Sequence, residues 1–312
     1  MKDLNLYLAQ SFRLSTWLAC LGLVILSMNA QDLADIKKAG VIRHLGIPYA
    51  NFVTGAEDGF DVELVQKFAV SLGVKYQYVR TDWGTLVGDL TGQTAKAKGQ
   101  DAEITGQAPI KGDIGASGIT IIPWRKKVMN FSEPEFPTQV WLIARADSAI
   151  RPIKPTGSLD SDIVAVKSLL AGHSLYCKSS TCLDPSLYDI AATKAEYKLF
   201  PGALNELAPA IIKGEAELTL LDVPDTIVAL QKWPGAVKIL GPISSVQEMG
   251  VTFRKESPEL LKAFNQFLTG MKADGSYRRL MEKYYPIVFD YFPDFFRTPP
   301  ANGTKRTASA AP

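Results

Sequence analysis

The sequence contains little cysteine, little histidine and almost no net charge. It has 3 Cys and 2 His, and its 34 Lys and Arg nearly balance its 32 Asp and Glu, for a net charge of +2. This balance gives no argument for a nucleic-acid or strongly acidic partner. His44 and His173 have no neighbouring set of catalytic or metal-ligating groups, so we interpret both as structural and expect no metal and no cofactor.

Long hydrophobic runs are also missing. After residue 30 no stretch has the roughly 20 apolar residues that a membrane span requires. The chain of 312 residues is nevertheless 46% hydrophobic and 21% charged, which is typical of a globular protein. Its length predicts about two domains of ordinary size.

The first thirty residues form a separate segment. Lys2 and Arg13 precede the apolar run WLACLGLVILSM, and Asn29-Ala30 follows it. This order predicts a secretory signal peptide at 1–30, cleaved after Ala30. Met28 is larger than the small residue usual at that position, so a retained anchor stays an alternative. Most of the apolar run follows Cys20, which argues against a lipid anchor there.

Two cysteines, Cys177 and Cys182, remain after this segment. An even number of cysteines in an exported chain favours a disulfide between them. Zinc bound with the help of His173 is the alternative, but a fourth ligand is missing and the spacing is not that of a zinc finger.

The order of predicted elements is that of an α/β protein. A short helix ending at Gly40, a strand at 41–47, a helix at 59–73 and a strand at 74–79 open a parallel sheet. Residues 91–112 are a polar excursion that could form a hairpin, and we favour the interpretation that it decorates the surface. A second α/β pattern starts near residue 160. A helix begins at Pro258 with Ser257 as its N-cap, and residues 291–312 are expected to be a disordered tail.

Three motifs in this order resemble one known family. They are GFDVELVQKFAVSLGV, DIGASGITIIPWRKKVMNFSEP and MGVTFRKESPELLKAFNQFLTGMKADGSYRRLMEKYY, and the resemblance covers roughly residues 32–286. The chain resembles the extracytoplasmic solute-binding proteins of polar amino-acid ABC transporters (family 3, type II periplasmic-binding fold). The resemblance implies an α/β fold of two lobes with mixed central sheets, joined by two hinge strands.

The resemblance also implies lobe boundaries. Lobe one would comprise residues 32–144 plus 246–290, and lobe two residues 145–245. The hinge would lie at the two crossings near Ala144–Ser148 and Ile243–Glu248, which suits closure by a few residues at the ends of elements.

The site that the resemblance implies holds an amino acid by its charged ends. Arg125 would bind the carboxylate, since a guanidinium matches a carboxylate in bidentate fashion. The other implied ligand-binding residues are Thr120 and Gly118 beside that carboxylate, the turn with Ser180 and Thr181 at a helix N-terminus, Asp222 for the ammonium group, and Tyr49 and Phe52 as an aromatic wall.

Each of these residues also has a structural interpretation. Asp222 could cap the helix that follows it, Tyr49 and Phe52 could be packing, and the Ser180 turn could be only an N-cap. Trp124 is more often a packing residue than a ligand contact. The loop around Tyr49 is also shorter than the family's usual form and lacks the acidic residue often found before the aromatics. A substrate other than an ordinary amino acid therefore stays open.

The implied function is that of a periplasmic receptor. It would be a monomer, not an enzyme, that captures a small carboxylate-bearing solute, most simply an amino acid, and delivers it to a membrane permease of an ABC transporter. The alternative is an enzyme on the same fold, such as a cyclohexadienyl-type dehydratase, for which Glu248 or Glu217 could be nominated. A lytic transglycosylase is disfavoured, because about 25 residues after the binding module are too few for a catalytic domain.

Overall fold

A computed structural model describes residues 32–55 and 57–297 of the chain. The predicted signal peptide and residues 298–312 of the predicted tail lie outside the described residues. No helix in the described ranges is long and apolar enough to cross a membrane.

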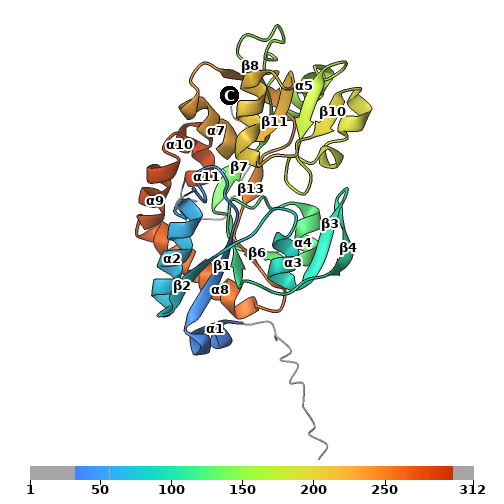
Figure 1. Ribbon diagram of the computed structural model, residues 1–312. Coiled ribbons are helices and arrows are strands. Elements are labelled where there is room, and N and C mark those ends of the chain that lie inside the picture. Colours follow the sequence, from blue (N-terminus) through green and yellow to red (C-terminus); the bar gives the residue numbers. More distant parts are fainter. Residues whose placement is uncertain (1–31, 56, 298–312) are drawn as a thin grey trace, which may run out of the picture.

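The fold contains two five-stranded sheets, one above the other in Figure 1, each with its own helices. The first sheet has the order β2-β1-β5-β14-β6. Its strands are β1 (Val41–Gly46), β2 (Lys75–Arg80), β5 (Ile114–Gly115), β6 (Asn130–Phe131) and β14 (Thr252–Phe253). The strand β1 is parallel to β2 and β5, whereas β14 is antiparallel to β5 and β6. The sheet is therefore mixed.

The second sheet is also mixed and has the order β10-β9-β11-β8-β12. Its strands are β8 (Val140–Arg145), β9 (Ser174–Cys177), β10 (Glu196–Leu199), β11 (Leu218–Asp222) and β12 (Val237–Pro242). The strand β11 is parallel to β9 but antiparallel to β8. The prediction of an α/β fold with two mixed central sheets is confirmed.

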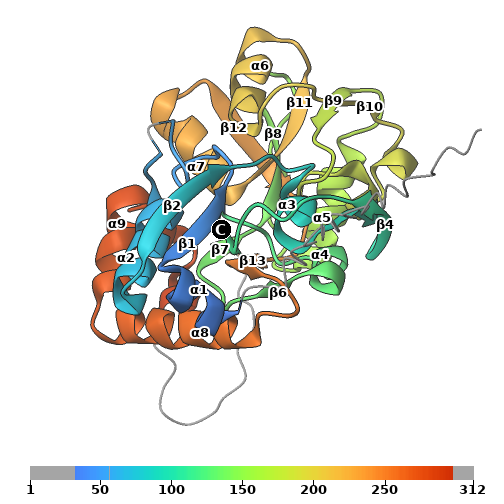
Figure 2. The ribbon, with the colours of Figure 1, turned by 60° about the horizontal axis from the view of Figure 1, so that its bottom comes forward.

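Helices cover both sheets (Figures 1 and 2). Those of the first part are α1 (Leu33–Ala39), α2 (Phe60–Leu72), α3 (Leu86–Thr91), α4 (Pro123–Val128), α8 (Pro258–Ala273), α9 (Ser276–Tyr284), α10 (Val288–Tyr291) and α11 (Pro293–Phe296). Those of the second part are α5 (Leu159–Ser168), α6 (Leu207–Lys213), α7 (Val223–Lys232) and the 3-10 turns η1 (Pro185–Leu187), η2 (Ile190–Thr193) and η3 (Leu204–Glu206).

A small two-stranded sheet lies between the two parts. It pairs β7 (Phe136–Thr138) with β13 (Gln247–Met249) in antiparallel fashion. The next strand along the chain, β8, belongs to the second sheet, although residues 140–144 were expected in the first lobe. The chain thus crosses about six residues earlier than the sequence suggested, because the apolar stretch at 140–144 is a buried interior strand of the second sheet, between β11 and β12.

The excursion at 91–112 is a hairpin of β3 (Gln93–Lys98) and β4 (Asp101–Gln107). It packs against α3 and α4. Ala95, Ala97 and Ala102 lie against the buried cluster that includes Trp124 of α4. The hairpin is therefore attached to the helix that carries Arg125.

Two terminal features differ from the expectation. Residues 291–297, predicted as the start of a disordered tail, include α11, and the ring of Tyr291 lies 5.9 Å from that of Trp141. Aromatic packing explains the order here. At the start of α8, the carboxylate of Asp32 accepts the N–H groups of Glu259 (3.2 Å) and Leu260 (2.8 Å), so a residue from the other end of the chain caps this helix.

Candidate functional site

The guanidinium of Arg125 lies between the two parts of the molecule. The helix α4 begins at Pro123, a favourable first residue, and places Arg125 inward with only 2% of its surface exposed. Its Nη1 donates to the Thr120 carbonyl and its Nη2 to the Ser180 carbonyl, both at 3.1 Å. The predicted site residues Thr120, Arg125 and Ser180 are thus brought together across the two sheets.

The charge of Arg125 is buried without an ion pair. Burial lowers the pKa of Arg125, but arginine stays protonated at any physiological pH. Within the described part of the chain its polar contacts are two carbonyl oxygens, and its guanidinium carbon lies 5.5 Å from the ring centroids of both Trp83 and Trp124. A buried cation is costly unless an anion compensates it, so this geometry is suited to an anionic ligand.

Gly118 is held in close contact with Phe52 and Asp61. Its φ of +59° is in the left-handed region, and a Cβ at this position would lie 2.4 Å from ring atoms of Phe52. Its N–H donates to Asp61 Oδ2 at 2.7 Å. The ring of Phe52 is fully buried and packs 5.1 Å from the rings of both Phe136 and Tyr285. Both residues therefore form the packed support behind the loop that leads to Thr120.

Asp222 is the last residue of β11 and caps α7. Its Oδ1 accepts the N–H of Asp225 at 3.4 Å, as an N-cap does, and also the hydroxyl of Tyr49. Its Oδ2 accepts the thiol of Cys182 at 3.2 Å. Burial raises the pKa of Asp222 above the ordinary value of an aspartate. The contact between Tyr49 and Asp222 joins the two parts of the molecule near Arg125.

The predicted disulfide between Cys177 and Cys182 is not present, since both cysteines are free and buried. Cys177 is the last residue of β9 and lies in the core of the second sheet, where burial raises the pKa of its thiol to about 12. Cys182 instead directs its thiol to Asp222. The two thiols therefore lie in different surroundings, and the spacing of the two cysteines in the sequence does not indicate this.

Metal binding has no support in the described ranges, where no group of three or more His, Cys, Asp and Glu side chains could hold an ion. His173 contacts Glu217 at 3.1 Å on the surface. His44 lies between the hydroxyl of Tyr76 and the carbonyl of Ala116, and burial lowers its pKa to about 4.

The turn that contains Ser180 and Thr181 is closed by its own hydrogen bonds. The N–H of Ser180, a residue with φ of +62°, donates to Asp184 at 3.3 Å. The hydroxyl of Thr181 donates to the Lys178 carbonyl and accepts the N–H of Leu183. The element that follows is the 3-10 turn η1 and not a longer helix. The contribution of this turn to the site is thus the Ser180 carbonyl.

Sequence reasoning missed Trp83 and Tyr188. Trp83 stacks on Arg125 and meets the ring of Tyr49 edge-on at 5.5 Å. It follows the carboxyl end of β2, and residues that follow parallel strands gather at one edge of a sheet, so this signal was available. The hydroxyl of Tyr188 donates to the Cys182 carbonyl at 2.5 Å. No local pattern around Tyr188 indicates that contact.

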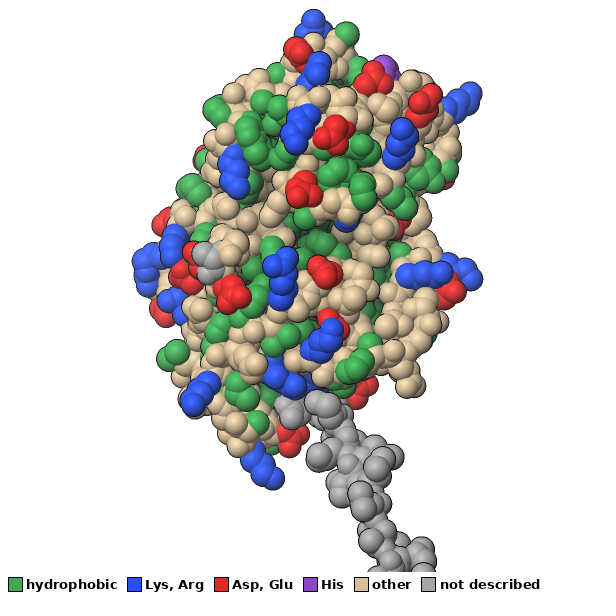
Figure 3. Space-filling view, in the orientation of Figure 1, with side chains coloured by type: hydrophobic (Ala, Val, Ile, Leu, Met, Phe, Trp, Pro, Cys, Tyr) green, Lys and Arg blue, Asp and Glu red, His purple; other side chains and the backbone are tan. Residues whose placement is uncertain are grey.

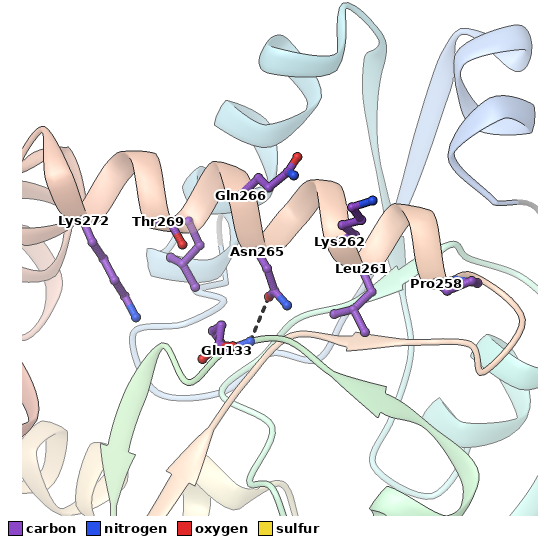
Figure 4. Close-up of a pocket in the computed structure, with 9 residues that line it drawn as sticks. Glu133, Pro258, Leu261, Lys262, Asn265, Gln266, Thr269 and Lys272 are labelled. Atoms are coloured by element: carbon purple, nitrogen blue, oxygen red, sulfur yellow. Dashed lines mark hydrogen bonds between the residues drawn. The ribbon is translucent and has the colours of Figure 1, made fainter. Parts of the chain in front are cut away.

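The surface has a narrow cavity between the two parts of the molecule and a larger groove along α8. A narrow cavity of about 20 Å³ lies between Ala50 of the first part and Asn205, Asp225 and Lys232 of the second. A shallow groove of about 630 Å³ follows α8 and contains none of the predicted site residues; there the Asn265 side chain accepts the N–H of Glu133 (Figure 4). In the view of Figure 3, cationic and anionic side chains are interspersed over both parts.

Known proteins similar to this chain fall into two groups. The L-cystine-binding protein TcyJ of Escherichia coli (strain K12) is 24% identical over 232 residues, which are 74% of this chain and 75% of that protein. A membrane-bound lytic murein transglycosylase F of Pseudomonas savastanoi pv. phaseolicola is 25% identical over 284 residues, or 88% of this chain. The chain spans about half the length of the transglycosylases, 52% in this case.

Solved structures show the same architecture. Holo ArgBP from T. maritima matches with a TM-score of 0.59 and 25% identity, over 81% of this chain and 99% of that one. The ancestral amino acid-binding protein AncCDT-1, a precursor of cyclohexadienyl dehydratase, matches with a TM-score of 0.61 and 26% identity, over 81% and 98% of the two chains. Residues 46–287 match the family of bacterial extracellular solute-binding proteins, family 3, and the chain belongs to that family.

Proposed function

We propose that this protein is the periplasmic solute-binding component of an ABC transporter and captures a small carboxylate-bearing solute between its two lobes. Export through the segment at 1–30, a monomeric state and delivery to a membrane permease are parts of this proposal. The observation that carries it is the buried guanidinium of Arg125, which reaches groups of both lobes and has no ion pair within the described residues.

The carboxylate would bind to Arg125 beside Thr120 and the turn of Ser180 and Thr181. Tyr49 and Trp83 would cover the rest of the solute, since their rings lie together next to the guanidinium. Gly118 and Phe52 would hold the supporting loop. The amino-acid-binding relatives and structures support a solute of this size.

Closure would occur about the strands β7 and β13, the small sheet between the lobes. A solute that contacts both lobes binds the closed state better than the open state, and this difference in affinity is what a population shift requires. A carboxylate bound to Arg125 would lie beside Thr120 in one lobe and Ser180 in the other, and so would contact both lobes.

The proposal is tested by thermal unfolding of the purified protein with amino acids and other small carboxylates. A solute at 100 times its Kd should stabilise the protein by about 2.7 kcal/mol. Arg125→Ala should abolish the shift, whereas Lys127→Ala, an exposed position on the same helix, should keep it. The absence of a shift for every carboxylate would contradict the proposal.

The alternative of an enzyme on this fold is tested in the same samples. The structural match to the precursor of a dehydratase makes this test necessary. NMR spectra of each stabilising solute, recorded over hours with the protein, should show no loss of the solute. If a solute is consumed and its consumption also requires Arg125, the protein is an enzyme and not a receptor.

A further inference from the structure

The carboxylate of Asp222 accepts hydrogen bonds from three groups of the protein. An ionised carboxylate offers about four acceptor positions. Three of them are taken by the hydroxyl of Tyr49, the thiol of Cys182 and the N–H of Asp225. An ammonium group of a bound solute would therefore have to compete with these donors for the carboxylate.

The two side-chain donors are held firmly in place. The ring of Tyr49 is buried, stacked 5.9 Å from Phe52 and edge-on to Trp83. Burial and the nearby Asp222 raise the pKa of the Cys182 thiol well above its usual range, so the thiol keeps its proton and stays a donor. The Tyr188 hydroxyl fixes the carbonyl of Cys182. These contacts are thus part of the packed structure around Asp222.

Arg125 presents the opposite situation. A guanidinium has five N–H donors in a fixed plane. Two of the donating nitrogens contact the carbonyls of Thr120 and Ser180, so about three N–H groups remain for a ligand. The site therefore offers several free donors to an anion, whereas most of the acceptor positions of Asp222 are already taken.

Asp225 is the other buried acid beside Asp222. Its Oδ2 has no hydrogen-bond partner in the described structure. Burial and the charge of Asp222 raise the pKa of Asp225 well above its ordinary value. Asp225 lines the cavity of about 20 Å³, which has room for about one water molecule. A space of that size leaves no room for a solute that carries an ammonium group.

We infer that the solute of this site is a small carboxylate without a free ammonium group, such as a 2-oxo or 2-hydroxy acid. The inference rests on the proposed function and narrows its ligand. Tyr49 and Cys182 are then specificity-determining residues: they occupy the acid that would otherwise receive the ammonium, and Arg125 supplies the attraction for the carboxylate.

Isothermal titration calorimetry on the full chain tests this inference with matched solutes. Pyruvate, L-lactate and L-alanine form one set, and 2-oxoglutarate and L-glutamate form a second. In the set that binds, the oxo or hydroxy acid should bind about tenfold or more tightly than the amino acid, because one unsatisfied charged group costs that much or more.

Three variants make the test specific. Cys182→Ala and Tyr49→Phe each remove one donor to Asp222 and should shift the preference about tenfold towards the amino acid. Cys182→Ser keeps a donor and should keep the original preference. A variant that fails to fold is recognised by its unfolding curve, and the wild-type comparison alone still decides the inference.

The possible outcomes separate the two proposals. An amino acid that binds the wild type more tightly than its oxo and hydroxy partners would overturn the inference and leave the proposed function standing. Binding of none of these solutes, together with no thermal shift for any other carboxylate, would overturn both.

Discussion

At the scale of single residues, Gly118 supports the candidate site through its contacts with neighbouring residues. Gly118 can approach the ring of Phe52 because it has no side chain, and its N–H is held by Asp61. This contact fixes the backbone from which the Thr120 carbonyl reaches Arg125. A supporting residue can therefore be as restrictive as a binding residue.

Gly118→Ala should destabilise the protein strongly. A left-handed φ costs a non-glycine residue about 1 kcal/mol, and the clash with Phe52 should add about 1–3 kcal/mol. Gly40→Ala is the matched control, since Gly40 has φ of +68° and open space around its Cβ position. Urea unfolding measures both. Equal losses of unfolding free energy in the two variants would show that a Cβ beside the ring of Phe52 adds no cost.

Asp61→Asn should change how stability depends on pH. Burial raises the pKa of Asp61 to about 7, so between its unfolded value near 3.8 and about 7 the folded state holds a proton that the unfolded state has lost. The stability of the wild type therefore falls across this window as the pH rises. The variant has no such proton, and its free energy of unfolding relative to wild type should rise by on the order of 3 kcal/mol between pH 4 and pH 8.

Urea unfolding at pH 4, 6 and 8 checks this prediction. The amide oxygen of Asn can still accept the N–H of Gly118, so the variant should fold. The comparison removes the contribution of His44, whereas the buried Glu135, whose pKa the charge of Asp61 helps to raise, responds to the substitution together with Asp61. A difference in unfolding free energy that is the same at all three pH values would contradict a raised pKa at Asp61.

At the scale of elements, the hairpin of β3 and β4 supports the Arg125 helix. One face of β3 carries Ala95 and Ala97 towards α3 and α4, while Lys96 lies on the exposed face and pairs with Glu103 at 3.5 Å. The sequence predicted surface decoration for this excursion. Its packing against α4 gives it a structural connection to the site instead.

Ala97→Asp should weaken both stability and solute binding. A carboxylate placed against the apolar cluster around Trp124 loses hydration, and we expect a loss of about 1–3 kcal/mol in unfolding free energy. Solute affinity, measured by calorimetry, should fall because α4 positions Arg125. Lys96→Ala removes only an exposed ion pair and should cost less than about 1 kcal/mol. If Ala97→Asp folds and its affinity for the solute is unchanged, the hairpin does not contribute to solute binding.

At the scale of the whole molecule, the lobes meet through a few polar contacts. They are Arg125 with the Ser180 carbonyl, Tyr49 with Asp222, and the N–H of Ala50 with the Asn205 side chain at 2.8 Å. The third contact lies outside the proposed set of solute-binding residues. A substitution at this contact can therefore change closure without changing the proposed solute-binding residues.

Asn205→Ala should reduce the apparent affinity for the solute several-fold. The loss of this hydrogen bond between the lobes should disfavour closure by about 1 kcal/mol, and the apparent Kd rises as the competent population falls. Lys198→Ala, an exposed substitution in the same lobe, is the control. Calorimetric Kd values that are equal in the wild type and Asn205→Ala would show that this contact does not contribute to closure.

Much of the fold could be predicted from the sequence because periodic apolar patterns and helix caps are local. The helix that begins at Pro258 and the alternation at residues 74–79 are examples. The crossing between the sheets was misplaced, because the apolar run at 140–144 does not reveal which sheet it joins. The thiol of Cys182 was misassigned because its partner Asp222 is 40 residues away. Arg125 was predicted as a binding residue from its motif and stays a prediction, and its contacts with Trp83 and Ser180 depend on tertiary packing that the motif does not show.

The central claim is that the lobes close on a carboxylate held by Arg125. Small-angle X-ray scattering with and without the best-binding carboxylate tests it most directly, for the wild type and Arg125→Ala. We predict that the radius of gyration of the wild type decreases when the solute is added and that Arg125→Ala shows no change. A decrease of the same size in Arg125→Ala, or no decrease in a wild type shown by calorimetry to be saturated, would contradict the account.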